Sequence, residues 1–372
     1  MAKLGKVQIQ GYRSLKSIEL ELRSLNILIG PNGAGKSNFV SFFKMLNEIM
    51  GGRLQQYIGI SGRAQSLLYF GPRVTRHLDA ELEFEAEEGT NWYNMRLSHA
   101  AGDTLTFAKE SLRFLKHGYT DPEALSLGAG HQETRISEEA NKGEQTAGVI
   151  RYLLNRCRVY HFHDTSATAR VRQYGLLEDN RWLMPDAGNL AALLYAYRGN
   201  RENPSVVYRR IVSTIRKIMP EFDDFDLEPS SLNRKEIILN WRKRGQDYLF
   251  GAHQISDGSL RAMAICTLFL QPEEDLPRVI ILDEPELGLH PHALEIVAGL
   301  IRAASSRTQV IAATQSQSFL NFFEPAEIVT VETDAGESVF RRLEPDQLED
   351  WLEDYSIGEL WQRNVVGGGP LP

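Results

Sequence analysis

The sequence is constrained most strongly by a glycine-rich stretch that directly follows a short apolar run. Residues 30–37 read Gly-Pro-Asn-Gly-Ala-Gly-Lys-Ser, and residues 25–29 read Leu-Asn-Ile-Leu-Ile. This order predicts a strand, a loop and a helix that begins near Ser37, which is the context that the pattern G-x-x-x-x-G-K-S/T requires. In such a loop, consecutive backbone N–H groups and the positive end of the helix face phosphate groups. The sequence therefore predicts a loop that binds a nucleoside triphosphate.

Each residue type in this loop suits one part of a nucleotide and its metal ion. We expect Lys36 to bridge phosphate oxygens and the Ser37 hydroxyl to bind Mg²⁺. Arg13 lies one predicted strand before the loop, and for its side chain a nucleotide contact and a plain solvated charge are both open. The candidate nucleotide-binding residues here are Gly30, Asn32, Gly33, Ala34, Gly35, Lys36, Ser37, Asn38 and Arg13.

The composition excludes several classes of protein. The 372 residues suffice for one large or two medium domains, and 42% hydrophobic with 24% charged residues is typical of a globular chain. No apolar run reaches the roughly 18 residues that a membrane span needs, and the first residues lack a signal-peptide core. Cys157 and Cys266 have no metal-ligand spacing, so we expect a reduced, cytoplasmic protein without a membrane partner. The net charge of −8 argues against a generally basic nucleic-acid-binding protein.

A second stretch in the last third carries two adjacent carboxylates. Residues 277–284 read Pro-Arg-Val-Ile-Ile-Leu-Asp-Glu, which predicts a buried strand that ends in Asp283 and Glu284. An acidic pair at a strand end is common, but the phosphate loop upstream gives it a specific meaning. We expect Asp283 to hold Mg²⁺ and Glu284 to polarise the attacking water as a general base.

Four motifs in this order resemble the head of ABC-type ATPases, in the branch of RecF and SMC proteins. Residues 283–291 resemble the Walker B motif and D-loop of that family, and residues 255–261, Ile-Ser-Asp-Gly-Ser-Leu-Arg, resemble its signature motif. Gln315 follows a predicted strand at the position of the family's switch residue. The turn at residues 11–14 also looks like the start of a RecF or SMC head. The chain is thus similar to AAA-family ATPases with an OLD-like head and no Toprim domain.

The resemblance implies an α/β fold, a P-loop NTPase of the ABC-ATPase head type. Its mixed sheet would be joined by an antiparallel β lobe and by an inserted, mostly helical second lobe. Residues 1–115 would hold the Walker A loop and a β meander, 116–250 an inserted loop and the second lobe, and 251–372 the signature, Walker B, D-loop and switch. Within the insert, the polar stretch 117–145 predicts a mobile loop or an insertion, and residues 164–220 look helical with an N-cap at Asn203-Pro204.

The resemblance also implies how the protein would act. In this family the signature motif of one subunit covers the γ-phosphate bound by another, which implies ATP and Mg²⁺ as cofactors and a homodimer or higher even oligomer. Ser256 and the backbone from Gly258 would then contact the partner's nucleotide, and Lys36, Glu284 and Gln315 would serve hydrolysis. Because no sustained heptads and no nuclease motif are present, DNA and a separately encoded nuclease are open as partners, in DNA maintenance or anti-phage defence.

Three departures from the family pattern leave alternatives open. The signature reads Ser-Asp-Gly-Ser, and Gln315 replaces the usual switch histidine, so hydrolysis could be slow. A Q-loop glutamine is not placed, with Gln65 and Gln173 as candidates. The rival function is a nucleotide-gated scaffold or sensor with little turnover. Two basic clusters fit either a local nucleic-acid groove or ordinary solvated surface: Arg151, Arg156, Arg158, Arg170 and Arg172, and Arg234, Lys235, Arg242, Lys243 and Arg244.

Overall fold

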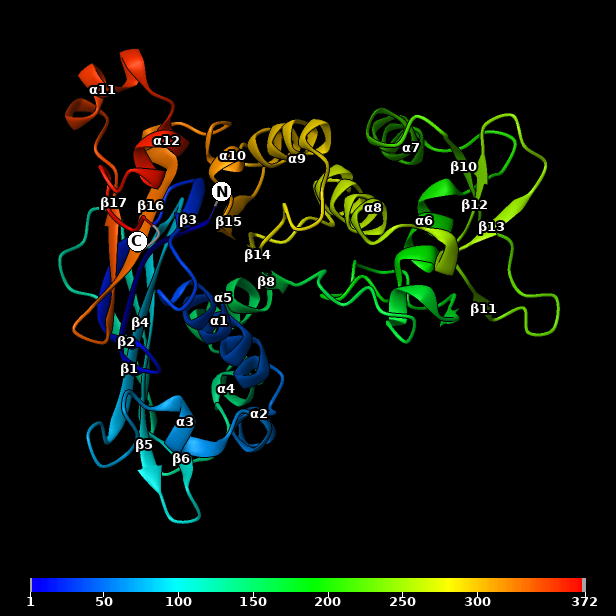
Figure 1. Cartoon of the computed structure of the whole chain (residues 1–372). Helices are drawn as coiled ribbons and strands as arrows, with labels where there is room; N and C mark the ends of the chain where they lie inside the picture. Colours follow the sequence, from blue (N-terminus) through cyan, green and yellow to red (C-terminus); the bar gives the residue numbers. More distant parts are fainter. Residues whose placement is uncertain (1, 370–372) are drawn as a thin grey trace. The chain divides into compact units, whose positions relative to one another are not determined.

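The computed structural model describes residues 2–369 and divides into two compact units (Figure 1). Unit 1 comprises residues 1–159, 277–281 and 309–372, and unit 2 comprises residues 160–276 and 282–308. This division by compactness differs from the three parts predicted by motif, because the segment after residue 115 returns to pack on unit 1. Ile136, Ile150 and Leu154 belong to the same hydrophobic core as the N-terminal strands.

One sheet of unit 1 is the predicted antiparallel meander. Its strand order is β2-β1-β4-β5-β6-β7. Every neighbouring pair is antiparallel. The strands are β1 (Lys3–Tyr12), β2 (Leu15–Glu21), β4 (His77–Ala86), β5 (Gly89–Ala100), β6 (Thr104–Lys116) and β7 (Glu123–Gly128). Along β4, buried residues alternate with more exposed ones, as expected for a sheet with one wet face.

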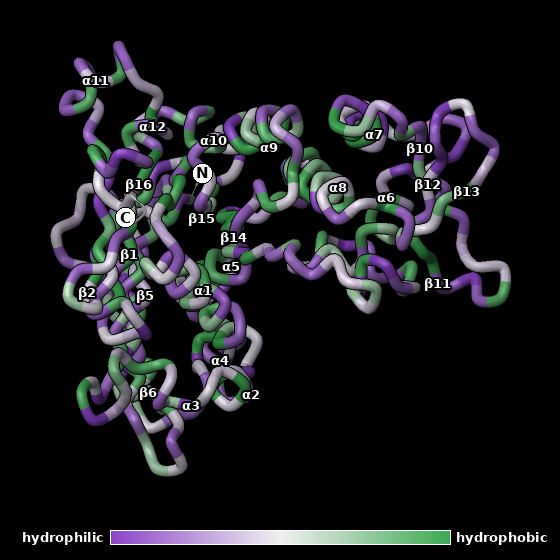
Figure 2. The backbone as a smooth tube through the Cα atoms, in the orientation of Figure 1, coloured by the Kyte–Doolittle hydropathy of each residue, from purple (hydrophilic) through white to green (hydrophobic). Residues whose placement is uncertain are grey.

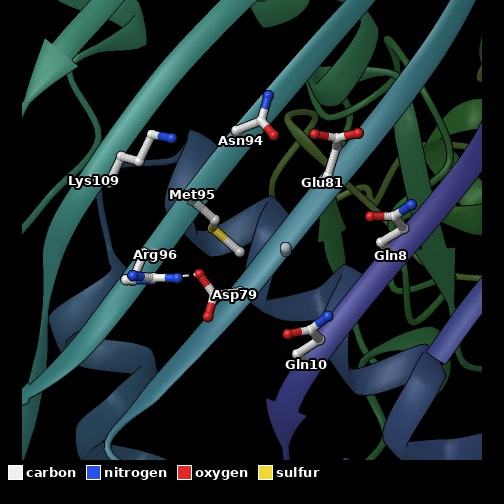
Figure 3. Close-up of a pocket in the computed structure, with 9 residues that line it drawn as sticks. Gln8, Gln10, Asp79, Glu81, Asn94, Met95, Arg96 and Lys109 are labelled. Atoms are coloured by element: carbon white, nitrogen blue, oxygen red, sulfur yellow. Dashed lines mark hydrogen bonds and ion pairs between the residues drawn. The ribbon is translucent and has the colours of Figure 1, made fainter. Parts of the chain in front are cut away.

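The wet face of this sheet balances its own charges. Figure 3 shows polar side chains of β1, β4, β5 and β6 around a shallow cavity of about 280 Å³. Arg96 Nε on β5 lies 2.6 Å from Asp79 on the neighbouring strand β4, and Arg113 Nη2 on β6 reaches across β5 to lie 2.8 Å from Glu81 on β4. These cross-strand ion pairs are typical of a solvated sheet face.

The second sheet is mixed, as the sequence predicts. Its order is β17-β16-β3-β15-β14-β8, and β3 runs parallel to both β15 and β16. The strands are β3 (Leu25–Ile29), β8 (Cys157–Tyr160), β14 (Val279–Asp283), β15 (Gln309–Thr314), β16 (Ile328–Asp334) and β17 (Glu337–Arg342). All residues of β3, β14 and β15 are buried, which is typical of central strands covered on both faces.

Helices of unit 1 pack their apolar sides against these sheets. α1 begins at Lys36, and its Phe42 ring lies edge-on to Tyr12 of β1 at 5.8 Å. The other helices of unit 1 are shorter than α1. The elements are α1 (Lys36–Met50), α2 (Leu54–Ile60), α3 (Arg63–Leu67), α4 (Ile136–Asn141), α5 (Gln145–Asn155), α10 (Gln317–Leu320), η3 (Pro325–Glu327), η4 (Pro345–Gln347), α11 (Glu349–Asp354) and α12 (Ile357–Gln362).

For residues 117–145 the sequence left a mobile loop or an insertion open, and the loop interpretation is wrong. The segment contains β7 and α4, and it is attached to the meander by the fully buried carboxylate of Glu110. That carboxylate accepts hydrogen bonds from the Thr134 hydroxyl at 2.5 Å, Tyr93 at 2.9 Å and the backbone N–H of Arg135 at 3.1 Å. The polar composition of the segment gave no sign of these hydrogen bonds to Glu110.

Unit 2 combines helices with two small sheets. It contains η1 (Arg170–Arg172), α6 (Leu190–Arg198), α7 (Val206–Ile218), η2 (Ala252–Gln254), α8 (Asp257–Leu270) and α9 (Pro291–Ala304). β10 (Phe222–Asp226), β12 (Asn240–Lys243) and β13 (Leu249–Gly251) form one sheet, and β9 (Gly175–Leu176) pairs with β11 (Glu236–Ile237). α8 is apolar along most of its length (Figure 2), and almost all of its residues from Leu260 onward are buried.

Two helix predictions in unit 2 need correction. Residues 164–189 are mostly irregular instead of helical, because side chains satisfy their backbone there; Asn189, for example, donates to the carbonyl oxygens of Asp179 and Trp182. α7 is capped by Ser205, whose hydroxyl accepts the Tyr208 N–H, and not by Asn203. Among the described residues, no helix is long and apolar enough to cross a membrane.

Candidate nucleotide site and signature region

The phosphate loop connects β3 to α1 in unit 1. Gly35 is the N-cap of α1 with φ of +113°, a backbone conformation that favours glycine. Lys36 is only 4% exposed, and its ammonium group donates to the carbonyl oxygens of Gly30 at 2.6 Å and Pro31 at 3.0 Å. The side chain is therefore folded across the loop that contains it, and its charge is concentrated there.

The start of α1 has the donor arrangement that a triphosphate needs. The first hydrogen bond that closes the helix runs from the Phe39 N–H to the Gly35 carbonyl at 3.0 Å. The amides before Phe39 therefore lie in the first turn, where the helix itself supplies no acceptor and its dipole is positive. Asn32, Gly33 and Ser37 are exposed at this end, while Ala34 is buried. These residues fit the phosphates of a nucleotide.

A polar contact beneath the loop was not predicted. Asn38 donates from Nδ2 to the Ser14 hydroxyl at 2.7 Å, and Ser14 and Ser338 share a hydroxyl–hydroxyl bond of 2.7 Å. The predicted turn at residues 11–14 pointed toward Ser14. Nothing in the sequence pointed to Ser338, because β17 reaches the loop only through sheet pairing. This bond network holds the first turn of α1 against the β1–β2 turn.

Arg13 and Gln315 lie on elements next to the loop. Arg13 has φ of +48°, and its guanidinium carbon lies 5.6 Å from the centre of the Tyr12 ring. Its Nε is buried and has no hydrogen-bond partner within the described part of the chain. Gln315 follows Thr314, which pairs in register with Ile29, the residue before Gly30. Gln315 and the phosphate loop therefore leave the sheet at the same edge.

The two Q-loop candidates lie elsewhere in the fold. Gln65 is part of α3 in unit 1. Gln173 follows η1 in unit 2, and its side-chain amide donates to the Ala167 carbonyl at 2.7 Å. Neither position gives a reason to prefer one candidate over the other.

The predicted Walker B carboxylates end β14. Asp283 is 9% exposed, and Glu284 adopts φ of +47° in the left-handed region. For a residue other than glycine this conformation costs about 1–3 kcal/mol and is characteristic of functional sites. In the sheet, β15 lies between β14 and β3, the strand that leads into the phosphate loop.

Two histidines that the sequence reasoning missed lie beside these carboxylates. His161 Nδ1 is 3.8 Å from Asp283 Oδ2, and His163 Nε2 is 3.9 Å from Glu284 Oε2. His163 Nε2 is also 3.0 Å from the Asp283 backbone oxygen. Both histidines follow β8, the edge strand beside β14, and nothing in the sequence pointed to them, because the contact depends on which strands become neighbours in the sheet.

The signature region forms an exposed start of α8. Ser256 caps the helix by accepting the Ser259 N–H at 3.2 Å, and both Ser256 and Asp257 are exposed. Gly258 touches the D-loop turn so closely that a Cβ would lie 2.2 Å from the Gly288 carbonyl oxygen. The exposed helix end supplies backbone N–H donors of the kind that bind anions.

A buried arginine fixes this helix start. Arg172 is 8% exposed and donates to the carbonyl oxygens of Ala252 and Ile255 and, at 2.7 Å, to the Asp257 carboxylate. Arg172 is one of the basic residues that left a nucleic-acid groove open. Its hydrogen bonds give Arg172 a structural role, so this residue no longer supports a nucleic-acid groove.

The residue types present also fit Mg²⁺. Within residues 2–369, no three His, Cys, Asp or Glu side chains come together as a metal site. Mg²⁺ at nucleotides usually takes one or two protein oxygens, phosphate oxygens and waters. The exposed Ser37 hydroxyl and the Asp283 carboxylate are oxygen ligands of this kind.

Two families match parts of the chain. Residues 159–321 match the family described as "AAA domain, putative AbiEii toxin, Type IV TA system". Residues 2–66 match the family described as "AAA ATPase domain". The first segment contains the signature and Walker B residues, and the second contains the phosphate loop. No curated protein matches the chain.

Solved SMC heads share the fold. An Smc head bound to the C-terminal winged-helix domain of ScpA is 16% identical, with a TM-score of 0.59 over 93% of this chain and 99% of that chain. A Pyrococcus furiosus Smc head with an extended coiled coil, bound to the C-terminal domain of ScpA, is 14% identical, with a TM-score of 0.58 over 95% of this chain and 99% of that chain. A Pyrococcus yayanosii Smc head with a coiled coil and joint is 12% identical, with a TM-score of 0.53 over 95% of this chain and 99% of that chain.

These likenesses show the fold. The family matches show that the segment with the phosphate loop and the segment with the signature and Walker B residues both resemble ATPase domains. The predicted P-loop NTPase fold of the ABC-ATPase head type is confirmed. Two segments of the chain thus match AAA ATPase domain families, which supports ATPase activity, and the chain as a whole has the fold of solved Smc heads.

Proposed function

We propose that the chain is a Mg²⁺-dependent ATPase whose two copies close over two ATP molecules and thereby control a partner. The observation that carries the proposal is the start of α8. Ser256 and Asp257 are exposed, yet Arg172 holds this helix end in place through the Asp257 carboxylate. A fixed, exposed anion site suits the phosphate of a second subunit, and two copies related by a twofold axis would each supply one.

The chemistry divides among the predicted residues. The phosphate loop and Lys36 would hold the triphosphate, and the Ser37 hydroxyl and Asp283 would hold Mg²⁺, which offsets the phosphate charge. Glu284 would orient and deprotonate the attacking water. Gln315 would contact the γ-phosphate through an amide, which stays uncharged at every pH.

The work of closure requires a partner, for which we propose DNA together with a separately encoded nuclease in DNA maintenance or anti-phage defence. Two similar Smc heads were solved bound to domains of ScpA, which supports a protein partner for heads of this fold. Arg209, Arg210 and Lys217 lie exposed along α7, which suits contact with DNA phosphates. Because hydrolysis needs a steady ATP supply, we place this activity in the cytoplasm.

The direct test is the ATPase rate of the full chain with and without duplex DNA that carries ends or gaps. The proposal predicts turnover that requires Mg²⁺ and rises with DNA. An ATPase rate that is the same with and without DNA would contradict the proposed DNA partner, while the proposed ATPase activity would stand. A second arm of the test is Arg209→Glu with Arg210→Glu, which should lower stimulation by DNA and leave the basal rate unchanged.

Gln315 favours a second candidate function, a nucleotide-gated scaffold or sensor. An amide at the switch position cannot become charged, so γ-phosphate sensing could occur with little turnover. Near-zero hydrolysis combined with ATP-dependent assembly would support the scaffold. Steady turnover by the dimer would exclude it.

A further inference from the structure

The segment after β8 lies against the turn that carries Glu284. In the sheet, β8 is the neighbour of β14, and the residues that follow the two strands lie within contact distance of each other. The rings of His161 and His163 lie 4.0 Å apart with a tilt of 32°. Both rings border the Asp283–Glu284 pair, at 3.8 Å and 3.9 Å from the two carboxylates.

His163 contacts the backbone of this pair through a hydrogen bond. Its Nε2 lies 3.0 Å from the carbonyl oxygen of Asp283. A carbonyl oxygen only accepts, so Nε2 carries the proton and donates. This carbonyl belongs to the peptide group that joins Asp283 to Glu284. The bond therefore restrains the peptide plane from which the Glu284 side chain starts.

That restraint matters because Glu284 is in a strained conformation. Its φ of +47° lies in the left-handed region, which residues with a Cβ rarely adopt. Such a conformation persists only where the surroundings determine it. A donor fixed on the preceding carbonyl is a contact of this kind.

Arg261 of α8 holds the histidine segment and the Glu284 turn together. Its Nε donates to the Phe162 carbonyl at 3.0 Å, and Nη2 donates to the His163 carbonyl at 2.9 Å. Nη1 donates to the carbonyl of Leu287, in the turn after Glu284, at 3.2 Å. Since Arg261 lies on the helix that Ser256 caps, one guanidinium links the signature region to both segments.

We propose that His163 is a positioning residue for Glu284, and that Arg261 couples both to the start of α8. This inference rests on the proposed role of Glu284 as the general base. A phosphate of the partner subunit's nucleotide that docks at Ser256 shifts α8, and Arg261 transmits that shift to the peptide that His163 holds. The base is then aimed only when the second subunit is in place.

The test separates a donor role from a merely structural one. His163→Ala should lower kcat by on the order of tenfold to a hundredfold, because a base that is misplaced by a fraction of an ångström aims poorly. KM for ATP, ATP affinity by calorimetry and the melting temperature should stay close to those of the parent chain. His163→Gln should recover most of the rate, since its amide can donate to the same carbonyl. The matched control is His292→Ala, an exposed histidine of α9.

Two kinetic outcomes would overturn the proposal. One is an unchanged kcat in His163→Ala. The other is a folded His163→Gln that is as impaired as His163→Ala, which would mean that the ring matters and the donor does not. Arg261→Lys, which keeps the charge but loses the fork of donors, should lower kcat with unchanged ATP affinity. An unchanged kcat in this variant would contradict the coupling.

A measurement without turnover distinguishes this inference from the proposed function. In ¹⁵N-histidine spectra of the folded chain, the His163 ring should be the Nε2–H tautomer with a slowly exchanging proton, because Nε2 faces the Asp283 carbonyl oxygen. His163→Gln assigns the signal. An Nδ1–H tautomer would overturn the proposal. A chain that shows the Nε2 proton but hydrolyses no ATP would contradict the proposed function and leave the hydrogen bond of His163 established.

Discussion

The Lys36 side chain in unit 1 is almost completely buried although it ends in a charged ammonium group. The loop carbonyls that it contacts belong to Gly30 and Pro31, so the ammonium is already directed into the loop. We predict that Lys36→Ala lowers ATP affinity by about tenfold to a hundredfold, the range of a lost charge-assisted hydrogen bond. Calorimetry measures this, with Lys44→Ala on the same helix as the matched control. Retained affinity in Lys36→Ala would show that the phosphates bind elsewhere.

The two cysteines are residues whose chemistry is set by burial alone. Burial raises the pKa of both the Cys157 and the Cys266 thiol to about 12. The reactive thiolate is therefore present at only about one part in ten thousand near pH 8. We predict that a thiol reagent modifies neither cysteine in the folded chain and both after unfolding, as measured by mass spectrometry. Rapid modification of the folded chain would contradict the packing around these residues.

Single residues also show what sequence reasoning can and cannot reach. The phosphate loop could be predicted because its chemistry lies in consecutive residues with a strand before and a helix after. His163 could not, because its contact with Asp283 spans 120 positions and depends on which strands become neighbours. The roles assigned to Lys36, Ser37, Asp283, Glu284 and Gln315 are predictions that the variants proposed for this chain test.

At the scale of elements, α8 and the D-loop turn are in contact through two glycines. A Cβ on Gly258 would lie 2.2 Å from the Gly288 carbonyl oxygen, which is too close for the helix to stay in place. We predict that Gly258→Ala lowers the ATPase rate at least about tenfold, because the signature region shifts, while ATP affinity at the phosphate loop is unchanged. Gly299→Ala in α9 is the control, since its Cβ would meet nothing within 4 Å. Equal rates in the two variants would argue against the signature role.

The Glu110 network decides whether residues 117–145 are an ordered element. Burial, and then the Glu110 carboxylate, raise the pKa of Tyr93 well above its ordinary value, so Tyr93 stays a hydroxyl donor. Glu110→Ala leaves the buried Tyr93 hydroxyl and the half-buried Thr134 hydroxyl without their acceptor, and we predict a loss of about 3–5 kcal/mol in the free energy of unfolding. Denaturant titration measures it, with exposed Glu138→Ala on α4 as the control. A loss below about 1 kcal/mol would mean that other contacts hold the segment.

The elements themselves were predictable where periodicity was strong. The continuous apolar runs of β3 and β14 each predicted a strand that the structure contains. Residues 117–145 and 164–189 misled the prediction, because their polar side chains bind buried partners far along the chain. Composition cannot distinguish such side chains from those of a solvated loop.

For the whole molecule, the SMC-like fold accounts for why the motifs are spread over both ends of the sequence. β3, β14 and β15 belong to one sheet although they come from opposite ends of the chain. The sheet therefore assembles only after most of the chain has been made, and a resemblance based on motif order could predict it where periodicity alone could not. The proposed pairing of two copies concerns contacts between molecules, so it needs a test in solution.

The central claim is that two copies close over ATP, with Ser256 of one copy on the nucleotide of the other. Glu284→Gln keeps the shape of the side chain but removes the base, so ATP should persist and hold the closed pair. The decisive measurement is the molar mass of Glu284→Gln by light scattering, with saturating ATP and Mg²⁺. The account predicts a mass twice that of the chain, and a monomer mass when Ser256→Arg is added. A monomer mass for Glu284→Gln under saturating ATP would contradict it.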